Sequence, residues 1–147
     1  MARILGVDFG KSKIGLALSD PSHKIASPLK TVRASQSIVH TVSLLLQELT
    51  KIDEGVERIV VGLPLALSGR DSDSTRLVRM FASLLQERGR LPVVLWDERL
   101  STVEVEKILK EGNVKRRQRA KHLDTMSATL ILQTYLNSKG PSEEWIK

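Results

Sequence analysis

The chain has 147 residues with a formal net charge of +6, and it contains no cysteine. This composition excludes disulfides, thiolate nucleophiles and cysteine-type zinc sites, and the positive charge favours a polyanionic partner. Aromatic residues make up 3% of the chain, too few for base-stacking platforms. Any nucleic acid would therefore be contacted mainly through its phosphates.

The chain has no run of about eighteen apolar residues, and its first expected strand begins too early to leave room for a signal peptide. We therefore expect a cytoplasmic protein without membrane contact, which the lack of cysteine fits. The length predicts a single domain over residues 1–138 with a buried core, followed by a loose tail over residues 139–147.

The first third of the chain predicts three strands. Residues 3–8 and 14–19 predict a hairpin, because bulky apolar residues alternate with small ones in the second segment. Residues 25–33 predict a third strand. Pro28 has no backbone N–H to donate, so this strand is best placed at the edge of a sheet.

The remainder predicts alternating helices and strands. Apolar residues recur at helical spacing over 38–52, and a buried strand is expected over 57–64. A second helix ends at Gly89 and is followed by a strand over 91–96.

A capping box at residues 101–104 then begins a third helix, which ends near Gly112. Residues 113–121 predict a basic connector, and the last helix is expected from about residue 120 to residue 137.

This order of elements predicts an α/β fold, with a mixed sheet covered by helices on both faces. In such sheets ligands gather at the carboxyl ends of the strands. Asp8, Pro64 and the pair Asp97-Glu98 all follow or end expected strands. The sequence therefore predicts a site at this edge of the sheet.

Asp8 lies between two glycines, Gly6 and Gly10. We interpret these glycines as leaving the backbone bare on both sides of the acid, so that a metal ion or a large anion can come close. An ionised acid at the end of a core strand is costly unless it is paired or metal-bound. The alternative is a strand-end acid bonded to loop backbone.

Three segments offer carboxylates that could meet: Asp8, the Asp97-Glu98 pair, and Asp124, expected in the first turn of the last helix. Such a set suits two Mg²⁺ or Mn²⁺ ions that hydrolyse a phosphodiester. Neighbours in a strand point to opposite faces, so at most one of the pair is expected to face Asp8. We favour Glu98 as the metal ligand and keep Asp97 as a close second candidate. For Asp124, stabilisation by the helix dipole is an equal alternative.

Basic side chains cluster near these acids, and next to them they predict a phosphate clamp. The alternative is a solvated surface. The predicted nucleic-acid-binding residues are Lys11, Lys13, Arg70, Arg99, Lys115, Arg116, Arg117, Arg119 and Lys121.

In four motifs the sequence resembles the YqgF/RuvX family of bacterial Holliday-junction-resolvase-like or pre-16S ribosomal RNA nucleases. The motifs are Gly6-Val7-Asp8-Phe9-Gly10 through Ser19-Asp20, Val61-Gly62-Leu63-Pro64-Leu65 with Gly69, Asp97-Glu98-Arg99-Leu100-Ser101-Thr102, and Lys121 with Asp124 and Ala128 through Leu136. The resemblance implies a ribonuclease-H-like fold with five strands in the order 3-2-1-4-5, strand 2 being antiparallel to the rest.

The resemblance also implies metal-dependent cleavage of nucleic acid by Asp8, an acid of the Asp-Glu-Arg motif and Asp124, in processing of the 5′ end of precursor 16S ribosomal RNA. Two positions depart from the family pattern. Lys13 stands where arginine is usual, which loses bidentate phosphate geometry, and Ala66 stands where asparagine is common.

Three other functions compete with the RNA nuclease. A branched-DNA resolvase would normally act as a symmetric homodimer, so a stable dimer would favour this hypothesis. The sequence leaves both a monomer and a homodimer open. A nucleic-acid-binding factor without catalysis would use the basic residues and not the acids. An ATP-binding protein of the actin and sugar-kinase type would need two such domains, and 147 residues provide one.

Overall fold

The computed structural model describes residues 2–10, 12–64, 72–97, 116–138 and 144–145, with the backbone alone for 116–124 and 144–145. Its elements are β1 (Arg3–Phe9), β2 (Lys13–Ser19), β3 (Ala26–Arg33), α1 (Ile38–Leu49), β4 (Val56–Leu63), α2 (Asp73–Gly89), β5 (Val93–Asp97), α4 (Arg116–Asn137) and β6 (Glu144–Trp145). The helix expected near residues 101–112 lies outside the described residues.

The strands form one mixed sheet in the order β3-β2-β1-β4-β5-β6. Strand β2 is antiparallel to both neighbours, whereas β1, β4 and β5 are parallel to one another. The expected order 3-2-1-4-5 with an antiparallel second strand is therefore confirmed. Strand β3 lies at the edge, as Pro28 predicted. Residues 144 and 145, within the segment expected to be loose, pair with β5 and add a sixth strand.

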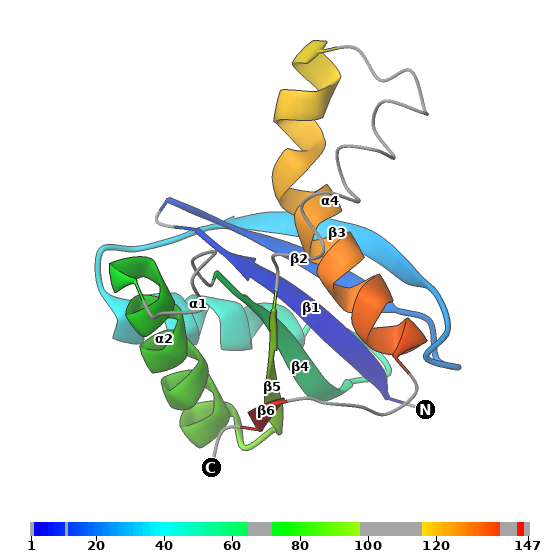
Figure 1. The fold of residues 1–147 in the computed structure, drawn as a ribbon. Helices are drawn as coiled ribbons and strands as arrows, with labels where there is room; N and C mark the ends of the chain where they lie inside the picture. The colour runs from blue at the N-terminus through cyan, green and yellow to red at the C-terminus, as the bar shows by residue number, and fades with distance from the viewer. Residues whose placement is uncertain (1, 11, 65–71, 98–115, 139–143, 146–147) are drawn as a thin grey trace.

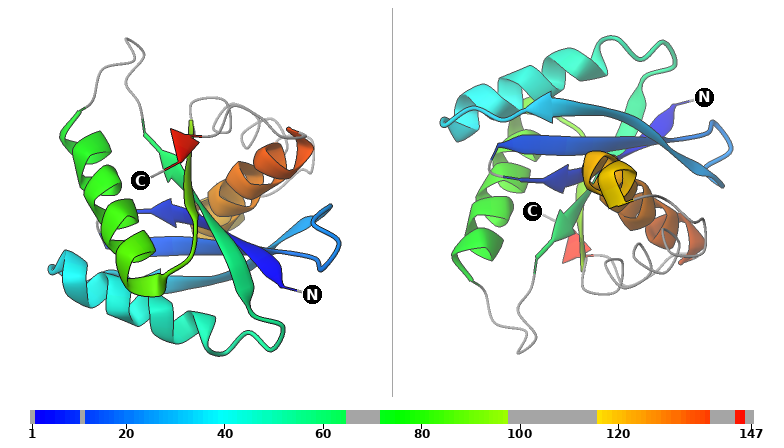
Figure 2. Two further views of the ribbon diagram at one scale, coloured as in Figure 1. Left: turned by 90° about the horizontal axis from the view of Figure 1, so that it is seen from below. Right: turned by 90° about the horizontal axis from the view of Figure 1, so that it is seen from above.

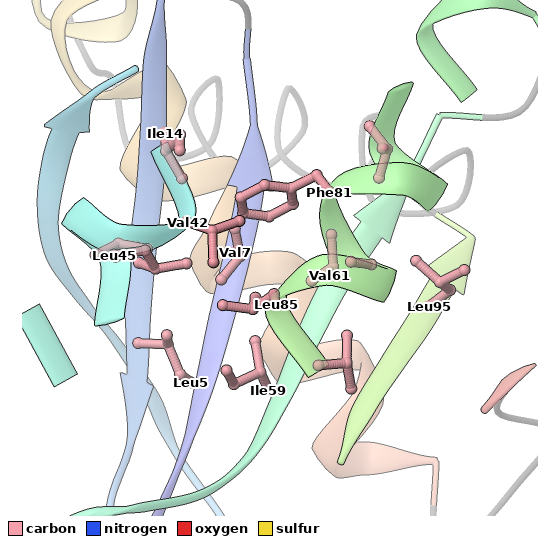
Figure 3. Close-up of a cluster of buried hydrophobic side chains, with 14 of the residues drawn as sticks. Leu5, Val7, Ile14, Val42, Leu45, Ile59, Val61, Phe81, Leu85 and Leu95 are labelled. Carbon is pink, nitrogen blue, oxygen red and sulfur yellow. The ribbon is translucent and has the colours of Figure 1, made fainter. Parts of the chain in front are cut away.

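Helices cover both faces of the sheet, as expected (Figures 1 and 2). Helices α1 and α2 lie on one face, where alternate strand residues such as Leu5, Val7 and Val61 form the larger apolar cluster (Figure 3). Helix α4 crosses the other face, where Ile4 and Val60 pack against its buried residues. Because side chains alternate along a strand, each strand position can be assigned to the α1/α2 face or the α4 face.

Two helix ends differ from the sequence-based expectation. Helix α4 begins at Arg116, so Arg116, Arg117 and Arg119 lie in its first turns and not in a connector. Arginine is a strong helix former, which explains the earlier start. Helix α2 includes Gly89, and the left-handed residue that ends it is Arg90, with φ of 53°. Among the helices that the structure describes, none is long and apolar enough to span a membrane.

The turn between β2 and β3 is organised by the Asp20 carboxylate. Its Oδ1 accepts hydrogen bonds from the backbone N–H of Ile25 at 2.9 Å and of Lys24 at 2.7 Å, and Oδ2 accepts one from the Ser22 hydroxyl. These bonds, those of Ile25 and Ser22 foremost, hold the pKa of Asp20 well below its usual range.

The low pKa makes this turn sensitive to acid. The folded protein binds the Asp20 proton less readily than the unfolded chain, so the stabilisation is complete above the unfolded pKa near 4 and is lost as pH falls. We expect the free energy of unfolding, measured by urea denaturation, to fall between about pH 5 and pH 2. Asp20→Asn should flatten this dependence. Asp53→Asn, at an exposed position, is the matched control and should leave the dependence unchanged.

Candidate active site

Asp8 lies at the carboxyl end of β1, half-buried, on the α4 face of the sheet. The register fixes its surroundings: Asp8 is opposite Gly15 of β2, and the preceding Val7 is opposite Val61 of β4. Gly62 is therefore the next β4 residue along, and it shares the α4 face with Asp8. The sheet surface on both sides of the Asp8 side chain is thus formed by buried glycines of the neighbouring strands.

The strand end that carries Asp8 is fixed from the opposite face. Phe9 points towards α2, where its ring lies 4.5 Å from that of Phe81, at an interplanar angle of 39°. Phe81 is fully buried in the cluster beneath α1 and α2. The carboxylate therefore projects from a strand whose last residue is packed into the core.

The interpretation of Gly6 and Gly10 as open space beside Asp8 is wrong. A Cβ on Gly6 would lie 2.7 Å from the Cβ of Leu132 and 3.0 Å from the carbonyl oxygen of Ala128, so α4 occupies this position. A Cβ on Gly10 would lie 2.5 Å from the carbonyl oxygen of Lys13, so Gly10 is required by the hairpin turn. The glycines that lie beside Asp8 across the sheet are Gly15 and Gly62, both of which are buried.

Helix α4 runs antiparallel to β1. Near its carboxyl end, Tyr135 accepts a hydrogen bond from Arg58, which is opposite Ile4 in the β1–β4 register. One and two turns earlier the helix lies against Gly6 through Leu132 and Ala128. Towards its amino end, α4 therefore proceeds in the direction of Asp8, and Figure 1 shows its first turns extending beyond the sheet.

Position 124 lies one turn before Ala128, on the same side of α4. It is about two turns from the first helical residue, not in the first turn as expected, because the helix begins at Arg116. The helix-dipole explanation for Asp124 is therefore wrong, since that effect is confined to the terminal turn. The backbone path instead carries this position towards the end of β1 that holds Asp8.

Four contacts hold α4 in this position. Gln133 accepts a hydrogen bond from the backbone N–H of Ala26 at 2.8 Å and donates one to the carbonyl of Lys24 at 3.0 Å. The indole of Trp96 donates to the Thr134 hydroxyl at 3.0 Å. The Trp96 ring also meets Tyr135 edge to face, with centroids 5.5 Å apart. Helix α4 is thereby tied to both β3 and β5.

Asp97 lies on the opposite face from Asp8. It ends β5 in register with Leu63, a member of the cluster beneath α1 and α2. Residues in register across parallel strands share a face, so Asp97 belongs to the α1/α2 side. Asp97 is thus not brought together with Asp8. Glu98 lies outside the described residues.

The family model described as "RuvX: Holliday junction resolvase" matches residues 2–138. The chain belongs to the RuvX family. A protein of Protochlamydia amoebophila (strain UWE25) named "Putative pre-16S rRNA nuclease" is 46% identical over 142 residues, which cover 94% of this chain and 95% of that protein. A protein of the same name from Koribacter versatilis (strain Ellin345) is 42% identical over 142 residues, which cover 97% of this chain and 91% of that protein. The family suggested by the sequence motifs is confirmed.

Solved structures share the fold of this RuvX family member. T. thermophilus RuvC in complex with Holliday junction substrate superposes with a TM-score of 0.59 at 15% identity, covering 99% of this chain and 100% of RuvC. The fowlpox virus Holliday junction resolvase gives a TM-score of 0.54 at 13% identity, covering 94% and 99%. At these identities the likeness shows the fold alone, and the ribonuclease-H-like fold is confirmed.

The basic residues predicted to bind nucleic acid fall into three groups. Lys13 is exposed at the start of β2, on the α4 face. Four lie in the first turns of α4, where the backbone alone is described: Arg116, Arg117, Arg119 and Lys121. Outside the described residues are Lys11, Arg70, Arg99 and Lys115. Within the described part of the chain no group of three or more potential metal-ligating side chains occurs.

The contact at Gly6 gives a stability prediction for this RuvX family member. Gly6→Ala places a methyl group against the α4 backbone and should cost about 1–3 kcal/mol of unfolding free energy, measured by urea denaturation. Gly89→Ala is the matched control: its Cβ meets only the side-chain end of Leu46 at 3.0 Å, which can rotate away. This control should leave the stability unchanged or raise it by up to about 1 kcal/mol, because alanine is the better helix former. Equal losses in the two variants would contradict the assigned role of Gly6.

Proposed function

We propose that the protein is a metal-dependent endonuclease that hydrolyses RNA phosphodiesters at the Asp8 end of β1 and processes the 5′ end of precursor 16S ribosomal RNA in the cytoplasm. One observation carries the proposal. Asp8 shares its sheet face with α4, and the helix stripe through Leu132 and Ala128 continues to position 124 in the direction of Asp8. Family membership and the names of the relatives support the RNA substrate.

The proposed metal ligands are Asp8, Glu98 and Asp124. Asp97 lies on the α1/α2 face, opposite to the face that carries Asp8, so of the pair we retain Glu98 as the proposed ligand. All three side chains offer the hard oxygen ligands that Mg²⁺ and Mn²⁺ prefer. A bound pair of such ions would supply the activation of water and the stabilisation of the leaving oxygen.

The protein's own residues would position the substrate. Gly15 and Gly62 lie beside Asp8 in the sheet and have no side chain that would stand next to the carboxylate. The basic first turns of α4 extend beyond the sheet (Figure 1), where they would attract and hold the RNA backbone.

Branched DNA is the second candidate substrate, because the family description names a Holliday junction resolvase. A junction resolvase makes paired cuts and so requires two sites, which a homodimer would provide. The RNA nuclease can act as a monomer. Cleavage of a four-way DNA junction, measured beside a precursor RNA substrate and together with the molecular mass in solution, separates the two proposals.

The catalytic set is tested with three variants. Asp8→Asn and Glu98→Gln keep the size of each side chain but remove the charge, and each should reduce cleavage of a precursor 16S RNA leader in Mg²⁺ or Mn²⁺ by about 100-fold or more. Asp97→Asn is the matched control on the adjacent residue and should retain most of the activity. Initial rates at saturating RNA give the comparison.

Two outcomes would contradict the proposal. Unchanged cleavage in Asp8→Asn, with folding verified by circular dichroism, would exclude a catalytic role for this site. A large loss in Asp97→Asn with none in Glu98→Gln would reverse the assignment of the metal ligand. Titration with Mn²⁺ adds a readout independent of turnover: Asp8→Asn should lose Mn²⁺ binding, and Asp97→Asn should keep it.

A further inference from the structure

Two exposed cations face each other across the β2–β3 ladder. Lys13 and Arg33 are direct partners in the antiparallel register, and both are exposed. The register places Gly15 opposite Thr31 and Ile14 opposite Val32. Because Ile14 and Val32 belong to the cluster beneath α1 and α2, Lys13 and Arg33 lie on the α4 face, the face that carries Asp8.

Like charges directly opposite each other in a sheet are destabilising, so this pair needs an explanation. Neither cation forms an ion pair with another described residue, whereas cations elsewhere on the sheet do. Lys30 on β3 meets Glu48 at 3.1 Å, and Arg3 on β1 pairs with Glu54. The unneutralised pair is thus set apart from its neighbours and would be relieved by an external anion.

The pair lies close to the acid. Asp8, Gly15 and Thr31 form one row across β1, β2 and β3, and Lys13 and Arg33 are two residues further along their strands. Two residues of strand span about 7 Å, and Lys13 and Arg33 also lie about 5 and 10 Å from Asp8 across the sheet, one and two strands away. Their long side chains can reach a phosphate that lies between them and the acid. A polynucleotide with one phosphate at Asp8 can therefore present an adjacent phosphate to both cations.

The backbone beneath the pair is fixed. The ladder continues beyond Arg33, where the N–H of Ala34 donates to the carbonyl of Ser12 at 2.9 Å. On the other side of Lys13, a Cβ on Gly10 would lie 2.5 Å from the Lys13 carbonyl oxygen, so the end of β1 passes close to the start of β2. The two cations therefore project from hydrogen-bonded strand backbone, and little backbone ordering would be needed to bind an anion.

We propose that Lys13 and Arg33 form a two-cation clamp for the phosphate adjacent to the scissile one. The clamp rests on the proposed nuclease function, because it assumes that the bound RNA passes Asp8 and then crosses Gly15 towards the edge strand β3. Arg33 supplies the planar, bidentate contact that Lys13 cannot make. In this proposal Arg33, on the opposite strand, makes the phosphate contact that an arginine at position 13 would make in other family members. Arg33 is therefore a positioning residue for the substrate.

The clamp is tested by binding of a precursor 16S RNA leader in the Asp8→Asn background, which keeps the RNA intact. We expect Arg33→Ala to weaken binding about 3–10-fold at 0.1 M salt and to lower the slope of log K against log salt by about 0.7–0.9, the value for one lost phosphate contact. Arg88→Ala is the matched control, removing the same charge from the exposed end of α2 next to Arg90. It should leave affinity and slope unchanged.

Stability and cleavage provide two further readouts. Because the like-charge pair is unfavourable, Arg33→Ala should raise the thermal midpoint while it weakens RNA binding, a combination that a purely structural role would not produce. Arg33→Lys should restore the salt slope but not the cleavage rate, since it keeps the charge and loses the bidentate contact.

Two results would overturn the clamp. One is an Arg33→Ala variant that binds RNA as tightly as the Arg88→Ala control. The other is an Arg33→Lys variant that cleaves RNA at the parent rate, which would show that the bidentate contact is not needed. If the parent protein fails to cleave the leader, the proposed nuclease function fails. The binding and stability measurements still decide whether Lys13 and Arg33 hold a nucleic-acid phosphate.

Discussion

The contact between α4 and the bare backbone of Gly6 sets the geometry of this molecule. The Leu132 Cβ and the Ala128 carbonyl oxygen occupy the space where a side chain on Gly6 would lie. A helix is a rigid rod, so fixing one turn against the sheet also fixes the path of the turns before it. The position of residue 124 relative to Asp8 therefore depends on a glycine that takes no part in the chemistry.

The sheet separates two tasks between its faces. The α1/α2 face is a closed apolar core, in which Phe81 holds the last residue of β1. The α4 face carries Asp8, the glycines beside it and the exposed Lys13. A shift of one residue in a strand exchanges the faces, so the register that buries Leu63 also keeps Asp97 away from Asp8. The same packing that stabilises the core thus determines that Asp8 and Asp97 lie on different faces of the sheet.

Much of the fold could be predicted from the sequence, because hydrophobic periodicity and turn residues act locally. The alternation in residues 14–19 predicted β2, and Pro28 placed β3 at the edge. The family motifs supplied the strand order, which periodicity alone does not give. The start of α4 was placed too late, because a run of charged helix formers reads equally well as a connector.

The site was harder to predict, because its geometry depends on pairing between strands. Gly6 and Gly10 are neighbours of Asp8 in sequence, and their roles became visible only from what lies against them. Gly15 and Gly62 are far from Asp8 in sequence and adjacent to it in the sheet. The sequence did show that one face of β2 carries small residues. The strand that pairs with β2 had to be known before Gly15 could be placed beside Asp8.

Register also explains why Arg33 was missed. In sequence it is an isolated cation at the end of an edge strand, and only its pairing with Lys13 suggests a role in phosphate binding. The arrangement of the other described charges supports this proposed role. At the opposite end of β1 and β4, Arg3 pairs with Glu54 and His23 lies 2.9 Å from Glu57, so carboxylates accompany the basic groups there.

At the Asp8 end the described cations of the β2–β3 hairpin have no such partners. Among the described residues, exposed positive charge on β2 and β3 is therefore concentrated at the Asp8 end of the sheet. The proposed nuclease would have to hold a polyanion beside its own carboxylates, and cations near Asp8 would offset the repulsion between those acids and the substrate. In the proposed clamp, the like charges of Lys13 and Arg33 lower the stability of the free protein and are neutralised by the bound phosphate, so the two residues would contribute to binding and not to folding.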